Sequence, residues 1–182
     1  IWMEVPPELH PTLISEYALG DVIIDNADPI DAVDIYSSVT AISGYSSEGN
    51  VGITNHAGAD LLAASVSGNA IGIYGYATTG DVSIDNAADI FALSAYYLAD
   101  GIFASGANVD VTNSGAIDVY GYTWAAGIEA QGTGTVSVDN SGDIYAEVFD
   151  VGTAFGVYVT GADVTVANSG NIEAQGYSGT GI

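Results

Sequence analysis

Hydrophobic and polar residues alternate in short segments along most of the chain, and one such segment recurs six times. Its pattern is Val-x-(Ile/Val)-x-Asn, and it begins at Val22, Val51, Val82, Val109, Val136 and Val164. The numbers of the asparagines that end these segments differ by 29, 31, 27, 27 and 28. Alternation with a period of two residues is typical of β-strands that bury one face, so each occurrence predicts a strand.

Each repeat contains two further segments of this kind. A small turn follows the asparagine, and a second alternating segment then begins at Ile30, Leu61, Ile90, Ile117, Ile144 or Ile172. A third segment contains a Gly-(Ile/Val) pair, which is Gly72-Ile73, Gly101-Ile102, Gly127-Ile128, Gly156-Val157 or Gly181-Ile182, with Ala41-Ile42 as a degenerate first copy. Three strands per repeat without helical periodicity predict an all-β fold, a three-sided parallel β-solenoid of about six coils.

The repeats occupy residues 20–182, in coils of about 27–31 residues, and the last coil is incomplete. Residues 1–19 break the pattern, because they contain three of the four prolines and several large apolar side chains. We expect this segment to be a short N-terminal cap or connection, with a short helix beginning near Pro11.

The two ends of the predicted solenoid are candidate self-association surfaces. End coils need a cover, because an open strand edge pairs readily with another chain. No capping segment follows the sixth coil, so either further coils follow or one copy completes the next. For the second alternative we expect end-to-end contacts made by Trp2, Met3, Val5, Leu9 and Ile182.

The asparagine that ends each first segment lies at the same phase of every repeat. These residues are Asn26, Asn55, Asn86, Asn113, Asn140 and Asn168. An asparagine side chain can bond backbone groups in a turn and can also donate to and accept from the next amide. We expect a ladder of hydrogen-bonded amides along one corner of the solenoid; the alternative is that each residue is only a turn former.

The chain has 23 acidic residues and no lysine or arginine, which gives a formal net charge of −23. Nucleic acids and anionic membranes both attract cationic side chains, so neither is an expected partner. Lysine nucleophiles and arginine clamps for phosphate or carboxylate are excluded as well. Because the sequence contains no cysteine, thiolate catalysis and disulfides are also excluded.

The predicted outward positions keep most of these charges apart. The position before the ladder asparagine is Asp25, Thr54, Asp85, Thr112, Asp139 and Ala167, and the position before the first valine is Asp21, Asn50, Asp81, Asn108, Thr135 and Asp163. Like charges opposite one another on neighbouring strands are destabilising, and alternation with neutral residues relieves this. We expect no cofactor and only diffuse screening by counterions, including divalent cations; specific Ca²⁺ sites are the alternative.

Candidate catalytic groups are few. The carboxyl pairs Asp118 with Glu147 and Asp31 with Asp34 would suit a glycoside hydrolase, but no repeat carries a long insertion that builds a cleft. His10 and His56 are far apart in sequence, and we expect each to be a solvated loop residue. The sequence therefore predicts no catalytic residue, no metal ligand and no enzymatic activity.

Aromatic residues recur at two kinds of position. Four tyrosines follow a glycine, at Gly44-Tyr45, Gly75-Tyr76, Gly121-Tyr122 and Gly176-Tyr177, where we expect them to cover corners. Phe91, Tyr120 and Tyr145 take the outward phase of the second strand. These rings pack across adjacent coils, or they form a stripe that contacts glycans or other subunits.

The repeat resembles the passenger repeats of bacterial autotransporters and related large surface adhesins. The resemblance covers residues 20–182 and rests on segments such as GDVSIDNAADIFA, VDVTNSGAIDVYG and VSVDNSGDIYAEV, with AAGIEAQG as a third strand. It implies a right-handed parallel β-helix and an extracellular or bacterial cell-surface location. It also implies a role as an adhesin, a stalk or an extracellular matrix fibre. Together with the few candidate catalytic groups and the uncovered end coil, this leads us to expect a non-enzymatic structural rod, either part of an adhesin stalk or the subunit of a head-to-tail filament. The alternative is a carbohydrate-binding or carbohydrate-cleaving β-helix, with surface glycans as partners.

Overall fold

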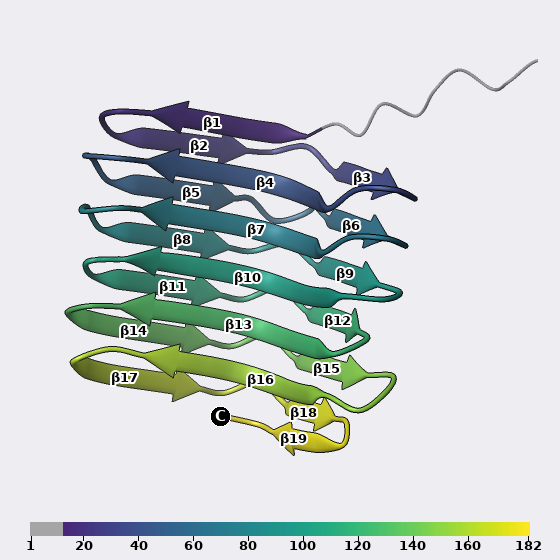
Figure 1. The fold of residues 1–182 in the computed structure, drawn as a ribbon. Helices are drawn as coiled ribbons and strands as arrows, with labels where there is room; N and C mark the ends of the chain where they lie inside the picture. Colours follow the sequence, from purple (N-terminus) through teal and green to yellow (C-terminus); the bar gives the residue numbers. More distant parts are fainter. Residues whose placement is uncertain (1–12) are drawn as a thin grey trace, which may run out of the picture.

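The computed structural model describes residues 13–182, and these residues form a stack of coils without a helix (Figure 1). Each coil contributes one strand to each of three sheets, and strand neighbours are equivalent strands of adjacent coils. The chain winds in a right-handed sense, as parallel crossover connections do. The predicted all-β, three-sided parallel β-solenoid of about six coils is confirmed.

The three sheets run along the whole stack. The seven-stranded sheet consists of β1 (Ile14–Ala18), β4 (Val39–Ser46), β7 (Ala70–Ala77), β10 (Leu98–Gly106), β13 (Trp124–Gly132), β16 (Thr153–Thr160) and β19 (Ser178–Thr180). The β2 sheet consists of β2 (Val22–Asn26), β5 (Val51–Asn55), β8 (Val82–Asn86), β11 (Val109–Asn113), β14 (Thr135–Asn140) and β17 (Asp163–Asn168). The β3 sheet consists of β3 (Ile30–Asp34), β6 (Leu61–Ser65), β9 (Ile90–Ser94), β12 (Ile117–Gly121), β15 (Ile144–Val148) and β18 (Ile172–Gln175).

Equivalent residues of successive coils pair in register, which stacks identical or similar side chains into columns. In the β2 sheet, Val109 pairs with Val82 on one side and with Val136 on the other. In the β3 sheet, Ile117 pairs in the same way with Ile90 and Ile144. Because these columns face inward and are almost fully buried, they form one aliphatic core along the stack.

Glycine at the centre of the third strand lets that strand bend toward the core. In β10 and β13, Ala99 pairs with Ala125 and Ile102 with Ile128, whereas Gly101 and Gly127 have no partner in the ladder of pairs. Both glycines are buried beside the isoleucine that follows. A Cβ atom at Gly127 would overlap the Ile144 side chain and a backbone carbonyl of the next coil. The position is therefore restricted to glycine by its close packing.

Replacing Gly127 with alanine is expected to destabilise the protein by about 1–3 kcal/mol, the usual result of overpacking a core. The matched control is Gly52→Ala on β5, where the nearest atom to an added Cβ is a carbonyl oxygen at 4.0 Å. Urea unfolding followed by circular dichroism measures both. Equal unfolding midpoints for the two variants would contradict the packing assigned to Gly127.

The solenoid begins earlier than the sequence predicted. Strand β1 pairs in register with β4, from Ile14 opposite Ile42 to Ala18 opposite Ser46, so residues 14–18 belong to the seven-stranded sheet. The boundary expected at residue 20 is therefore displaced, and the helix expected from Pro11 does not extend over these residues. Glu16 pairs with Gly44 and so occupies an inward column. Because a charged residue stands at this inward position, residues 14–18 lack the apolar alternation by which the other strands were recognised.

The last coil presents its core columns to solvent. Val164 in β17 is 45% exposed, whereas its equivalents in the preceding coils are buried. Ile172 and Ala174 in β18 are only partly buried, although they pack against the core.

Over residues 13–182 no helix is long and apolar enough to cross a membrane.

Candidate binding face on the seven-stranded sheet

The six repeated asparagines form a continuous hydrogen-bonded ladder. Each Nδ2 donates to the Oδ1 of the asparagine in the next coil, at 2.7–2.8 Å, from Asn26 through to Asn168. The same Nδ2 also donates to a carbonyl oxygen in its own turn, for example from Asn113 to Gly115 at 2.8 Å. The ladder satisfies buried polar groups at every coil and is a structural element of the corner.

A second ladder at another corner uses the position before the first valine. The Oδ1 atom of Asp21 accepts the backbone N–H of Asn50 at 2.8 Å, and Asn50 Oδ1 accepts the N–H of Asp81 at 2.8 Å. Asp81 and Asn108 repeat this with the N–H groups of Asn108 and Thr135, at 3.0 and 2.9 Å. Asp and Asn at these positions therefore cap the backbone of the following coil.

The charge spacing is regular on the β2 sheet and fails at one corner of the β3 sheet. Asp85 lies between Thr54 and Thr112 in the register of the β2 sheet, as the repeat predicts. Before the β3-sheet strands, however, Asp60 and Asp89 follow each other directly, and Asp60 Oδ1 accepts the Asp89 N–H at 3.2 Å. They line a shallow hollow with Asp118, whose pKa is raised by burial and by the charge of Asp89.

The seven-stranded sheet carries a row of stacked aromatic rings on its outer face. Tyr17, Tyr45 and Tyr76 share one outward column, and their ring centroids are 4.8 and 5.4 Å apart with interplanar angles of 8° and 5°. Tyr76 stacks on Tyr74 at 6.3 Å, and Tyr74 stacks on Phe103 at 5.1 Å. Rings from four successive coils therefore lie in one offset stack.

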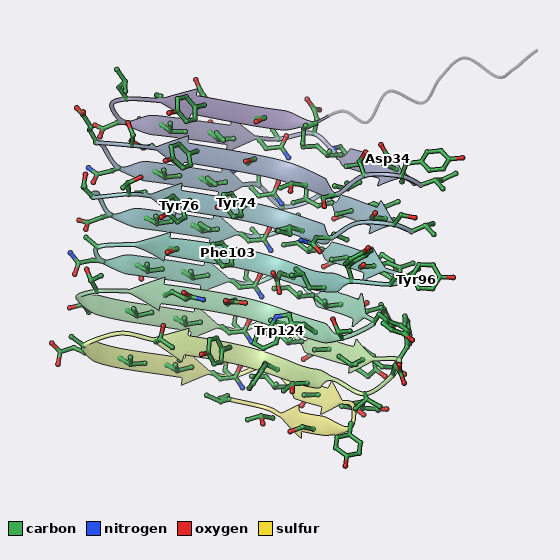
Figure 2. The ribbon with its side chains drawn as sticks, viewed as in Figure 1. Asp34, Tyr74, Tyr76, Tyr96, Phe103 and Trp124 are labelled. Carbon is green, nitrogen blue, oxygen red and sulfur yellow. The ribbon has the colours of Figure 1, made fainter. Side chains whose placement is uncertain are left out.

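A second aromatic group lies on the same face toward the C-terminal coils, and Glu129 separates it from Phe103 in their shared column. Trp124 of β13 lies 4.9 Å from Phe155 and 5.8 Å from Tyr158, measured between ring centroids. Figure 2 shows Tyr76, Tyr74, Phe103 and Trp124 on the same face, over β7, β10 and β13. We call the whole row the aromatic track, which comprises Tyr17, Tyr45, Tyr74, Tyr76, Phe103, Trp124, Phe155 and Tyr158.

Two carboxyl groups lie within the aromatic track and are largely shielded from water. Asp100 is 3% exposed and accepts a hydrogen bond from Trp124 Nε1 at 3.1 Å, and Glu129 is 8% exposed and accepts one from Gln131. Burial, together with the nearby charge of Glu129, raises the pKa of Asp100 to about 8. Burial also raises the pKa of Glu129. A carboxyl group desolvated in this way favours its neutral form.

Sequence reasoning missed Asp100 and Glu129. Asp100 shares its column with Ile71 and Ala126, and Glu129 shares its column with Phe103 and Tyr158. In each case the sign of a buried acid is one carboxyl group in a column that is otherwise apolar or aromatic. To recognise these columns from the sequence, one must already know the register of the third strand on both sides of the Gly-Ile bend.

The glycine-tyrosine pairs do not all lie where the sequence predicted. Tyr45 and Tyr76 lie inside β4 and β7 and belong to the aromatic track, so the expectation that they cover corners is wrong. Tyr122 and Tyr177 follow the ends of β12 and β18 and do lie in corners. Strands β4 and β7 each have eight residues and carry two outward positions after the bend, so Tyr45 and Tyr76 lie inside the strand and not in the corner that follows it.

The predicted aromatic positions of the β3 sheet form a smaller cluster. Ring centroids of Phe91 and Tyr120 are 5.4 Å apart, and those of Tyr120 and Tyr145 are 5.7 Å apart. Tyr145 donates its hydroxyl to Glu147 at 2.8 Å, which raises the pKa of Tyr145 to about 12. These rings pack across adjacent coils.

Neither carboxyl pair considered for catalysis consists of two side chains directly opposite each other. Asp34 ends β3 and its Oδ1 accepts the backbone N–H groups of Tyr36 and Ser37, at 2.6 and 3.1 Å, whereas Asp31 takes an outward position earlier in the strand. Asp118 is in register with Tyr145, so Glu147 lies diagonally from it on the neighbouring strand.

The other residues singled out in the sequence are on the surface or outside the described part of the chain. His56 is an exposed loop residue whose Nε2 lies 2.5 Å from Asp25 Oδ1. Ile182 is 60% exposed. Trp2, Met3, Val5, Leu9 and His10 lie outside the described residues. Within residues 13–182, no group of three or more histidine or acidic side chains is arranged to hold a metal ion.

Comparison with known proteins returned no match: no family model, no curated protein and no solved structure is significantly similar to this chain.

Proposed function

We propose that this protein is a non-enzymatic structural component of an extracellular or bacterial cell-surface assembly. In this role it is a rod, either a section of an adhesin stalk or the subunit of a head-to-tail filament. The observation that carries the proposal is the in-register stacking of the core columns and the asparagine ladder through six coils. Each coil contacts mainly its neighbours, so coils can be added without changing the interactions that hold the stack together.

One further feature supports a rod outside the cell. The sequence contains no lysine or arginine, so it offers no cleavage site to proteases that cut after basic residues. Resistance of this kind suits a durable extracellular material.

Immunogold electron microscopy of intact cells of the source organism tests the proposal. Antibodies against the purified chain are expected to label stalks or fibres outside the envelope, without permeabilisation. Labelling only after permeabilisation would contradict the extracellular role.

The non-enzymatic part of the proposal needs its own measurement. Purified protein incubated with a panel of neutral and acidic polysaccharides is expected to release no new reducing ends or unsaturated products. Turnover that is lost in Asp118→Asn or Glu147→Gln, but retained in the exposed β11 variant Asp110→Asn, would show that the protein is a carbohydrate-cleaving enzyme.

A further inference from the structure

The geometry points to the aromatic track as a binding site for a neutral, linear polysaccharide. We propose that the sugar chain lies along the rod axis, with about one sugar ring above each coil. A binding function of this kind goes beyond the structural role proposed above and does not depend on it, because a rod can carry the site whatever its length.

The spacing of the aromatic rings fits such a ligand. Rings on adjacent coils between Tyr17 and Phe103 repeat at 4.8–5.4 Å, because they project from strands that are themselves about 4.8 Å apart. Tyr74 and Tyr76 lie on the same strand, and their separation of 6.3 Å runs across the track. An extended β-linked hexose chain advances by a similar distance for each sugar. Tyr17 at the end of the row is 71% exposed, and Tyr45, Tyr74, Tyr76 and Phe103 are each partly exposed.

The charge distribution selects a neutral ligand. The strands from β4 to β19 of the seven-stranded sheet contain only two acidic residues, Asp100 and Glu129, and both are buried with raised pKa values. The other two sheets carry outward carboxylates such as Asp85 and Asp110. A polyanionic glycan would be repelled by a molecule with a net charge of −23, whereas a neutral glycan would not.

The same charge argues against a second copy as the main occupant of this face. Two rods of this chain each carry a charge of −23, and their side-by-side approach brings all of those carboxylates closer together. A neutral sugar chain covers the aromatic rings without this repulsion.

Polar side chains along the track can accept and donate hydrogen bonds to sugar hydroxyls. Ser105 and Gln131 continue the column of Tyr45 and Tyr76 into the next two coils, and both are only partly buried. The Tyr45 hydroxyl lies 3.2 Å from Thr78 Oγ1. An aromatic platform with a few fixed polar groups is the usual composition of a site that binds sugars in a defined orientation.

Isothermal titration calorimetry with cellohexaose and chitohexaose, two neutral β-1,4-linked hexamers, tests this inference. Affinity is expected to rise from the disaccharide to the hexamer, because each added sugar meets the ring of another coil. Hexagalacturonate, an anionic chain of equal length, is expected not to bind. Affinity that is independent of chain length, or equal affinity for the anionic hexamer, would overturn the inference.

Variants identify the face that binds. The double substitution Tyr45→Ser with Tyr76→Ser is expected to weaken hexamer binding at least about tenfold, since each ring contributes stacking energy of order one kcal/mol. Replacing both tyrosines with phenylalanine keeps the rings and is expected to retain binding. Tyr36→Ser is the matched control, because Tyr36 is 84% exposed in the corner between β3 and β4 and does not belong to the aromatic track.

Three results would overturn the site. They are the absence of hexamer binding by the wild-type protein, binding that is unchanged in the double serine variant, and a concentration-dependent dimer in sedimentation that this variant abolishes. The last result would assign the face to a second copy. Intact thermal unfolding of each variant shows that the coils remain folded. The immunogold experiment tests the structural role separately, so a result that rules out glycan binding does not rule out an extracellular rod.

Discussion

Replacing Asp100 with asparagine is expected to make the protein much less sensitive to pH between about 4 and 8. The pKa of Asp100 is raised from 3.8 to about 8 in the folded protein. The folded protein therefore binds this proton more tightly than the unfolded chain does. At pH values below the unfolded pKa the group is protonated in both states, and its ionisation does not lower the free energy of unfolding. As pH rises toward 8, the free energy of unfolding falls progressively, by on the order of 5 kcal/mol in total. This magnitude follows because each tenfold difference in proton affinity between the two states corresponds to about 1.36 kcal/mol.

Asparagine stays neutral at every pH and can still accept the Trp124 indole hydrogen bond. The variant is thus expected to be more stable than the wild type at pH 8 and similar to it, or slightly less stable, at pH 4. Urea unfolding of both proteins from pH 4 to pH 8.5 measures the difference. Parallel stability profiles for the two proteins would contradict the assignment of a buried, neutral carboxyl group.

Asp110→Asn is the control for this experiment. Asp110 is an exposed acid at an outward position of β11, so its replacement removes one charge of the same kind from the surface. Its effect is expected to be small, because an exposed charge is well screened by water and salt. A large pH-dependent effect of Asp110→Asn would show that general repulsion among the carboxylates, and not Asp100, controls the pH dependence.

Replacing Asn113 with alanine is expected to destabilise the protein by about 3–5 kcal/mol. Asn113 is 1% exposed, accepts from Asn86 Nδ2 and donates to Asn140 Oδ1, both at 2.7 Å. It also donates to the carbonyl of Gly115. Alanine leaves buried groups on both neighbouring coils without a partner, and each such group costs about 1–3 kcal/mol.

Asn168→Ala at the end of the ladder is the matched control. Asn168 accepts from Asn140 but is exposed, so water can replace the lost hydrogen bonds. Its replacement is expected to lower the free energy of unfolding by less than about 1 kcal/mol. Urea unfolding monitored by circular dichroism compares the two variants. Similar losses at both positions would show that the asparagines act only as individual turn formers.

The sequence was sufficient for the coils because the repeat fixes both phase and register. Once Val82 and Val109 are recognised as equivalent residues, parallel stacking places them side by side, and Asn86 must then lie next to Asn113. The ladder and the alternation of Asp85 with Thr112 follow from that single assumption.

The aromatic track was harder to predict because it depends on the third strand, whose pattern is the least regular. The bend at the central glycine, which is Gly72 in β7 and Gly101 in β10, places two successive residues toward the core and so changes the phase of every outward residue after it. Period-two counting therefore misplaces Tyr76 and gives no reason to associate Asp100 with Trp124. At the N-terminal end, Glu16 occupies an inward column, so the apolar alternation that marks the other strands is missing from β1.

The most direct test of the account is the measurement of NOEs between methyl groups in solution. In-register stacking predicts that the methyl groups of Val111 give NOEs to those of Ile84 and Val138, which lie one coil before and one coil after it. The same pattern is expected for Ile117 with Ile90 and Ile144. NOEs confined to residues close in sequence, without contacts between equivalent residues of successive repeats, would contradict the solenoid and every proposal that rests on it.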